Sequence, residues 1–159
     1  MAHVHLAQRS EHQQLEWIGD STVSVVLDAA ASDGQLMILE SRLRRGDASP
    51  VHVHGEEDEI FLMLQGSGTF WVGEERHELA DGGVAFLPRH LPHAYVITSE
   101  EAHVLTLATP GGLEGFFRSA GHDRSVPKPE GWAITPATLG AALAAHGGQV
   151  VGPPKGVDD

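Results

Sequence analysis

Histidine is the residue type that stands out in this sequence, with eleven among 159 residues. Two of them, His52 and His54, lie two positions apart in a segment whose valines predict a β-strand. Side chains two apart on a strand project from the same face, so both imidazoles can be aimed at one point. The acidic run that follows permits a turn, after which Glu59 opens another strand and can return a carboxylate to that point.

A further ligand is available at His93, which starts a later apolar strand. Imidazole and carboxylate ligands suit divalent first-row metals, and this set leaves one or two coordination positions for water, substrate or dioxygen. We therefore expect one divalent transition metal per chain, and the pattern does not choose among Ni, Mn, Fe, Co and Zn. The alternative is a polar cluster at the mouth of a barrel that holds no metal.

Strand alternation also predicts what surrounds these ligands. Phe61 and Met63 share a strand face with Glu59, and Tyr95 shares a face with His93. Phe61, Met63 and Tyr95 are therefore the expected substrate contacts. The other interpretation of Phe61 and Met63 is that they fill the interior of a small barrel.

Several polar residues beside the ligands are interpreted as loop residues. The acidic run formed by Glu56, Glu57 and Asp58 is expected to be a solvated loop. His90 precedes His93 in a proline-bearing turn, which places it either at the rim of the site or in solvent. Neither the acidic run nor His90 is expected to bind the metal.

The ligands require a β-rich scaffold, and the sequence supplies one. From Trp17 onward, short segments rich in Val, Ile, Leu, Phe and Thr are separated by Gly, Asp, Ser and Pro, the pattern of an all-β sandwich or barrel. Crossover helices between the segments are lacking, which disfavours a parallel α/β sheet. Strands are expected at residues 22–28, 35–44, 51–54, 59–65, 68–72, 75–79, 84–87, 93–97 and 104–108.

Two short helices are expected after the strands. Residues 109–121 carry Leu113, Phe116 and Phe117 at helical spacing, so this helix should close one end of the barrel. Thr135 and Pro136 suit the start of a second helix. The chain then divides into an N-terminal segment at 1–16, a barrel with its closing helix at 17–121, and a linker, helix and poorly ordered tail at 122–159.

Composition excludes several classes of protein and partner. The 22 acidic and 10 basic side chains give a net charge of −12, which repels nucleic-acid phosphates and anionic lipid headgroups. Cysteine is absent, which excludes disulfides, thiolate-bound zinc, iron–sulfur clusters and cysteine nucleophiles. The sequence shows neither a long apolar run nor a cleavable leader pattern, so we expect a cytoplasmic protein with no nucleic-acid or membrane partner.

The spacing of these residues resembles the cupin superfamily. The first cupin motif is glycine, five residues, His-x-His, three or four residues, glutamate, six residues and glycine, and it is matched throughout by Gly46, His52, His54, Glu59 and Gly66. The second motif is matched at Gly82, Pro88 and His93, while His90 replaces its glycine and Ile97 its asparagine. The resemblance covers residues 35–110 and implies a small jelly-roll β-barrel.

The sequence after the barrel narrows the resemblance. TPGG, an EGFF-type helix and an Ala-rich helix followed by VVGPP are similar to actinobacterial single-domain cupins of the quercetin 2,3-dioxygenase-like kind. That resemblance implies a metal-dependent dioxygenase that cleaves or oxidises a small enolic aromatic or polyketide-like compound. Glu59 would be both ligand and proton acceptor, and ring opening of a flavonol would release carbon monoxide.

Two other functions remain open from the sequence. One is a metal-dependent cyclase or isomerase that uses no oxygen, and the other is a non-catalytic module that binds a small ligand. Small cupins frequently pair through exposed sheet edges, so a homodimer is expected. The expected partners are thus a small-molecule substrate, dioxygen if the chain is an oxygenase, and a second copy.

Overall fold

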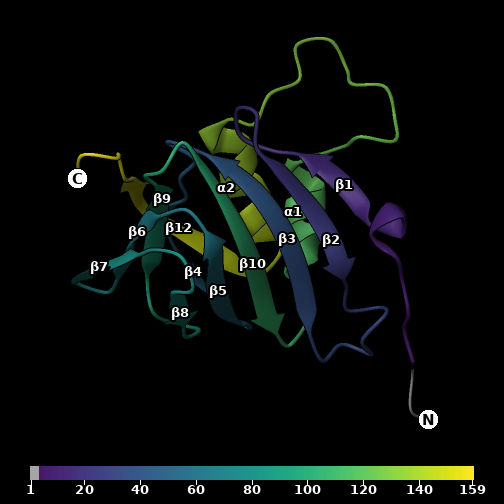
Figure 1. The fold of residues 1–159 in the computed structure, drawn as a ribbon, viewed down its shortest axis with the longest axis horizontal. Helices are drawn as coiled ribbons and strands as arrows, with labels where there is room; N and C mark the ends of the chain where they lie inside the picture. The colour runs from purple at the N-terminus through teal and green to yellow at the C-terminus, as the bar shows by residue number, and fades with distance from the viewer. Residues whose placement is uncertain (1–3) are drawn as a thin grey trace.

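The protein was analysed as a computed structural model that describes residues 4–159. The strands form two antiparallel sheets (Figure 1). The seven-stranded sheet has the order β11-β1-β2-β3-β10-β5-β8 and the five-stranded sheet the order β12-β4-β9-β6-β7. The first contains β1 (Gln13–Glu16), β2 (Thr22–Leu27), β3 (Met37–Arg44), β5 (Asp58–Gln65), β8 (Val84–Leu87), β10 (Glu101–Thr109) and β11 (His122–Asp123). The second contains β4 (Pro50–His54), β6 (Gly68–Val72), β7 (Glu75–Leu79), β9 (His93–Ile97) and β12 (Gly148–Pro154).

This arrangement confirms the all-β fold expected from the sequence. Each of the nine expected strands is present, and β6, β7, β8 and β9 have the expected bounds. The alternation on which they were predicted is visible in β5, where Glu59, Phe61 and Met63 are buried and the residues between them are partly exposed. A strand with one face in the core and one face outward produces this pattern.

The core has two parts, and two of the strands that carry candidate ligands, β5 and β9, contribute to the first of them. One cluster, within the barrel, includes Phe61, Met63, Phe70, Leu87 and Ile97. The other lies under the helices and includes Leu15, Trp17, Met37, Leu39 and Leu113.

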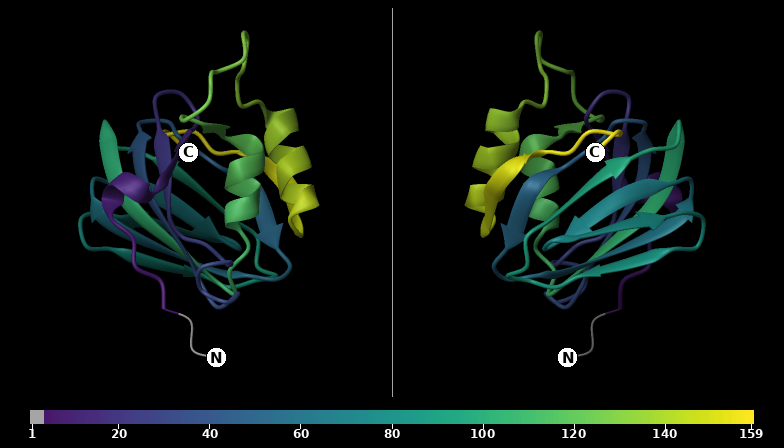
Figure 2. Two further views of the ribbon diagram at one scale, coloured as in Figure 1. Left: turned by 90° about the vertical axis from the view of Figure 1, so that its right-hand side faces the viewer. Right: turned by 90° about the vertical axis from the view of Figure 1, so that its left-hand side faces the viewer.

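The two α-helices lie on one side of the sheets (Figure 2). Helix α1 (Glu114–Ala120) packs Phe116 and Phe117 against Trp17, with ring centroids 5.8 and 5.0 Å apart. This contact confirms that the predicted apolar stripe docks on the barrel. Helix α2 (Pro136–Ala145) has the predicted proline in its first turn, and Thr135 accepts a hydrogen bond from the Thr138 N–H. None of the helices within residues 4–159 is long and apolar enough to cross a membrane.

The prediction of a poorly ordered tail is wrong. Residues 148–154 form β12, which pairs with β4 from Pro154↔Pro50 to Gly148↔His54. The two prolines obscured this strand in the sequence because proline cannot donate to a sheet ladder. They are tolerated here because β12 is an edge strand. The tail thus supports the strand that carries two of the candidate metal ligands.

Candidate metal centre

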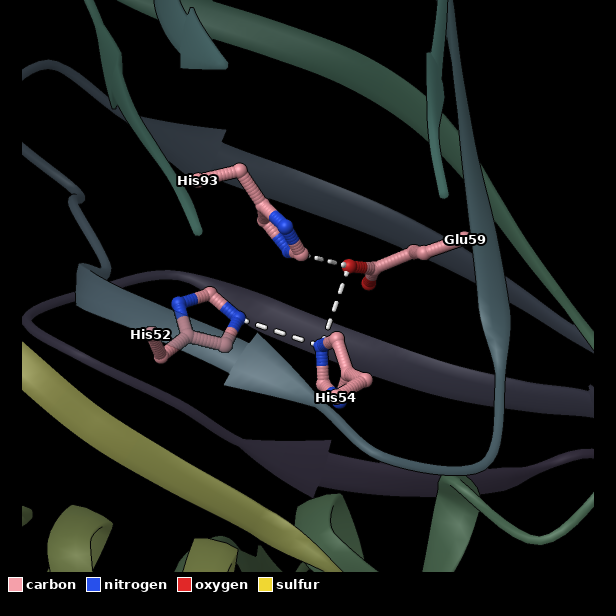
Figure 3. Close-up of side chains that lie close together, drawn as sticks. All are labelled: His52, His54, Glu59 and His93. Carbon is pink, nitrogen blue, oxygen red and sulfur yellow. Dashed lines mark hydrogen bonds and ion pairs between the residues drawn. The ribbon is translucent and has the colours of Figure 1, made fainter. Parts of the chain in front are cut away.

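Three strands bring the four predicted ligands to one point (Figure 3). His52 and His54 come from β4, His93 from the adjacent β9, and Glu59 from β5 of the other sheet. His52 and His93 are directly paired across the β4–β9 ladder, which places their rings side by side. The potential ligand atoms of the four residues lie within 4.8 Å of one another, and each residue is at most 9% exposed.

The distances between donor atoms are short enough for one ion. The Nε2 atoms of His52 and His54 are 3.1 Å apart. Glu59 Oε2 lies 3.4 Å from His54 Nε2 and 3.2 Å from His93 Nε2. A metal about 2.1 Å from each of two donors leaves them roughly 3.0–3.4 Å apart at angles near 90–110°. The observed separations fall in that range.

The other ring nitrogens of two histidines are held by the backbone. His52 Nδ1 donates to the carbonyl of Pro50 at 2.8 Å, and His93 Nδ1 donates to the carbonyl of Leu91 at 3.0 Å. A ring that donates through Nδ1 presents the lone pair of Nε2 to the centre, as a metal ligand must. His54 Nδ1 has no hydrogen-bond partner among the described residues, and Glu57 Oε2 lies 4.0 Å from it.

The electrostatics of the cluster favour a bound cation. Burial raises the pKa of Glu59, but the neighbouring His54 and His93 rings outweigh burial and hold this pKa well below its usual range. Burial and the neighbouring His93 lower the pKa of His52 to about 4. The centre therefore offers an ionised carboxylate and a neutral His52 ring, as metal binding requires. Burial lowers the pKa of His54, but Glu59 and Glu57 raise it overall, so protons compete with a metal at this ring. The donor set fits a divalent first-row metal.

The cluster opens onto an apolar cavity of about 60 Å³. Phe61, Tyr95 and Thr106 contribute to its wall from the sheets, and Trp17 contributes from the segment after β1. The helical side supplies Leu113, Phe116, Phe117, Leu139 and Leu143. Within the described chain, Glu59 is the only acidic residue that lines this cavity.

The structure places two of the three expected substrate contacts along the cavity and the third in the core. Phe61 and Tyr95 line the cavity, with ring centroids 5.3 Å apart. Met63 is 1% exposed and packs in the barrel core, and it is not among the residues that line the cavity. His90 is an exposed turn residue whose N–H donates to the carbonyl of His54 at 2.8 Å. It therefore supports the end of β4 through its backbone.

Two buried carboxyl groups near the site were not identified from the sequence. The prediction that Glu57 lies in a solvated loop is wrong, since Glu57 is buried beside His54. Asp47 is also buried and accepts a hydrogen bond from the Tyr95 hydroxyl at 2.9 Å. Burial raises the pKa of Asp47 to about 6, although hydrogen bonds from Ser21 and Tyr95 oppose the rise. The partner of the Tyr95 phenol within the chain is thus Asp47.

The sequence from β3 to β10 decides the family. Residues 39–109, which hold all four ligands, match the family described as the cupin domain. Residues 39–109 are a cupin domain. Its two sheets, the convergent histidines and the glutamate are therefore features of one known architecture.

Relatives of the cupin domain include an enzyme. The chain is 29% identical to quercetin 2,3-dioxygenase of Bacillus subtilis over 103 residues, a match that covers 65% of this chain. It covers only 31% of that enzyme, so the chain spans about a third of the length of this curated relative. The similarity is distant and concerns one part of the larger protein.

Solved structures support the fold. KdgF from Halomonas sp. superposes with a TM-score of 0.58 at 22% identity, covering 65% of this chain and 90% of that one. A predicted oxalate decarboxylase from Thermotoga maritima gives a TM-score of 0.61 at 19% identity, covering 67% and 99% of the respective chains. At these identities the likeness concerns the fold alone.

Proposed function

We propose that this chain is a metal-dependent dioxygenase that cleaves or oxidises a small enolic aromatic compound. The observation that carries the proposal is that a cluster of three histidines and a glutamate opens directly onto a cavity with an aromatic wall. The distant similarity to quercetin 2,3-dioxygenase supports oxygen chemistry on a substrate of this class. The substrate is named only by its chemistry: a planar ring with an ionisable hydroxyl group.

His52, His54, Glu59 and His93 would hold the metal. When bound, a divalent metal supplies Lewis acidity that stabilises negative charge on an enolate oxygen of the substrate. Glu59 Oε2 is placed to accept the proton that the enolic hydroxyl loses, since no other carboxylate among residues 4–159 lines the cavity. The low pKa of Glu59 keeps this oxygen ionised before substrate enters.

The apolar wall orients the substrate and excludes water. Phe61 and Tyr95 present ring surfaces on one side, and Phe116 and Phe117 present them on the other. Water-poor surroundings strengthen the electrostatic interactions at the reacting oxygen. At about 60 Å³ the cavity holds only a few water-sized groups, so an aromatic ligand has to widen it. The side chains of α1 and α2 belong to the part of the wall that is not held in a sheet.

An oxygen-uptake assay tests the proposal. Protein loaded separately with Fe, Mn, Ni, Co or Zn is offered flavonols and related enols while dioxygen, carbon monoxide and product are measured. Oxygen consumption in proportion to product, lost after metal removal and restored by reloading, is the expected result. Product formed equally well without oxygen would instead identify a cyclase or isomerase. Ligand-dependent thermal stabilisation without product would identify a binding module.

A further inference from the structure

A diagonal line of polar side chains crosses the inner face of the seven-stranded sheet. β5, β10 and β3 are neighbours in this sheet (Figure 1). Glu59 on β5 pairs with Ala108 of β10, and Thr106 lies two residues before Ala108. Thr106 in turn pairs with Leu39 of β3, and Ser41 lies two residues after Leu39. Because residues two apart share a strand face, Glu59, Thr106 and Ser41 all point inward and follow one another diagonally.

Thr106 and Ser41 are polar exceptions on an apolar surface. Thr106 is 3% and Ser41 4% exposed, and both residues line the cavity that opens from the metal centre. The residues paired with them across the sheet are all apolar: Leu39 and Phe61 beside Thr106, and Val23 and Val104 beside Ser41. Two hydroxyl groups are thus placed in a wall that otherwise repels polar groups.

The hydroxyls of Thr106 and Ser41 are not used by the fold. Ser49, which also lines the cavity, accepts a hydrogen bond from the Tyr95 N–H at 3.1 Å. Buried Ser21 accepts one from the Arg44 N–H at 3.0 Å. None of the hydrogen bonds formed among residues 4–159 engages the hydroxyl of Thr106 or Ser41. Since a buried hydroxyl without a partner costs free energy of folding, these two groups need a reason other than stability.

We propose that Thr106 and Ser41 are specificity-determining residues that hydrogen-bond polar groups of the substrate beyond the oxygen held at the metal centre. This inference rests on the proposed function, because it takes the enolic oxygen to lie beside Glu59. A hydroxyl both donates and accepts, so each residue can bind a hydroxyl or a carbonyl group of the ligand. The substrate class is therefore an enolic aromatic that carries further oxygen substituents along one edge.

The spacing of the diagonal line sets the length of that substrate. Diagonal neighbours on adjacent strands lie about 7–8 Å apart, so Thr106 is one such step from Glu59 and Ser41 is two steps, or about 14–16 Å, away. One step is comparable with the width of a substituted aromatic ring. A ligand with its enolic oxygen beside Glu59 therefore needs at least two rings to bring a polar group to Ser41.

The two hydroxyls select by penalising ligands that lack matching groups. Any ligand that covers Thr106 and Ser41 removes both hydroxyls from water. A purely apolar ligand leaves them unpaired, whereas a ligand with oxygen substituents at the right places restores their hydrogen bonds. The apolar wall favours aromatic compounds in general, and the diagonal line then distinguishes among them.

Anaerobic titration calorimetry on protein loaded with Zn, which has no redox chemistry, tests the proposal. The probes are unsubstituted flavonol, whose one hydroxyl is the enolic one, and quercetin, which adds hydroxyls on both outer rings. Wild type should bind quercetin at least about 10-fold more tightly. Thr106→Val keeps the side-chain volume but removes the hydroxyl, so quercetin binding should weaken about 3–10-fold while flavonol binding stays within about 2-fold.

Ser41→Ala should have the same effect, and the double variant should bind the two probes within about 3-fold of each other. Thr69→Val and Ser24→Ala are the matched controls. Thr69 is buried but does not line the cavity, and Ser24 lies on the opposite face of β2 from the buried Val23. Both controls should keep the wild-type preference for quercetin.

Urea unfolding supplies a readout that needs no ligand. Thr106→Val and Ser41→Ala should not lower the unfolding midpoint, because the hydroxyls that they remove have no partner in the chain. A midpoint lowered in both variants, equal affinity of wild type for the two probes, or a preference for quercetin that survives the double variant overturns the proposal. A preference lost in the double variant, in a protein that takes up no oxygen when loaded with Fe, Mn, Ni or Co, sustains the recognition role and refutes only the dioxygenase.

Discussion

His54 Nδ1 and Glu57 Oε2 lie 4.0 Å apart, and both atoms are buried without a hydrogen-bond partner among residues 4–159. The other two histidines of the site have their Nδ1 atoms held by backbone carbonyls. Glu57 is therefore the side chain that the structure places beside the outer nitrogen of the His54 ring, and we expect it to help orient that ring. Glu57→Ala should lower metal affinity about 10–100-fold, as loss of an orienting group typically does. Competition with a coloured chelator measures the change.

Glu56 provides the matched control for this experiment. It precedes Glu57 and is exposed, so Glu56→Ala removes the same charge without touching His54. Its metal affinity should stay near the wild-type value. Equal losses in the two variants would show that the effect is one of general charge and that Glu57 does not orient the ring.

The double variant His52→Ala/His54→Ala should bind no metal while keeping its fold. Both rings point into the polar cluster and contribute little to the two apolar core clusters. Metal analysis after reconstitution measures binding, and circular dichroism checks the fold. His77→Ala, which alters an exposed ring paired with Glu75, is the control and should retain full occupancy. Full metal occupancy in the double variant would show that His52 and His54 are not metal ligands.

Glu59→Gln separates the two roles of this residue. The amide keeps a carbonyl oxygen that can ligate, but it cannot accept a proton at neutral pH. Metal affinity should fall about 10–100-fold, and turnover per bound metal should fall about 10²–10⁴-fold further. Steady-state rates on metal-saturated protein provide the measurement. A wild-type rate per metal would leave Glu59 as a ligand without a proton-transfer role.

Asp47→Asn should alter the pH dependence of stability. Burial raises the pKa of Asp47 from 3.8 to about 6, so the folded chain holds this proton more tightly than the unfolded chain. The stabilisation contributed by the protonated carboxyl is therefore lost as pH rises from about 4 to about 6, by up to about 3 kcal/mol. Relative to wild type, the free energy of unfolding of Asp47→Asn should therefore rise by up to about 3 kcal/mol between pH 4 and pH 7. Urea unfolding at each pH measures the gain, and parallel curves for both proteins would contradict it.

Phe116→Ala should destabilise the contact between α1 and the barrel. The ring is partly buried and meets Trp17 edge to face. Truncating a fully buried phenylalanine to alanine lowers the free energy of unfolding by about 3–5 kcal/mol. Because this ring is only half-buried, the loss should be about 1–3 kcal/mol. Denaturant unfolding gives the value. An unchanged midpoint would mean that the helix contributes nothing to the stability of the barrel.

The ligand set could be predicted because its geometry is local. His52 and His54 share a strand face by simple alternation, and Glu59 follows after one turn. The convergence of His93 depends on the β4–β9 pairing, which alternation does not specify but the cupin spacing implies. Most strand bounds followed from the same period of two, interrupted by turn residues.

The burial of Glu57 could not be predicted, because it depends on distant segments. Glu57 lies next to Gly112, which follows 55 residues later in the sequence. The contact between Asp47 and Tyr95 likewise joins residues 48 positions apart. Acidic residues in a polar segment are predicted to be exposed to water. Tertiary packing, which the local sequence does not show, decides which of their carboxyl groups become buried.

The pairing of β4 with β12 determines when the metal centre can form. β4 pairs with β9 only at His52↔His93, whereas β12 pairs with β4 along the whole length of β4. During synthesis the chain therefore has to add the residues up to Gly148–Pro154 before the strand bearing His52 and His54 gains its main support. A loop of this length is slow to close, so metal capture should be among the last steps of folding. Nascent chains that lack β12 should carry both histidines and still fail to retain the ion.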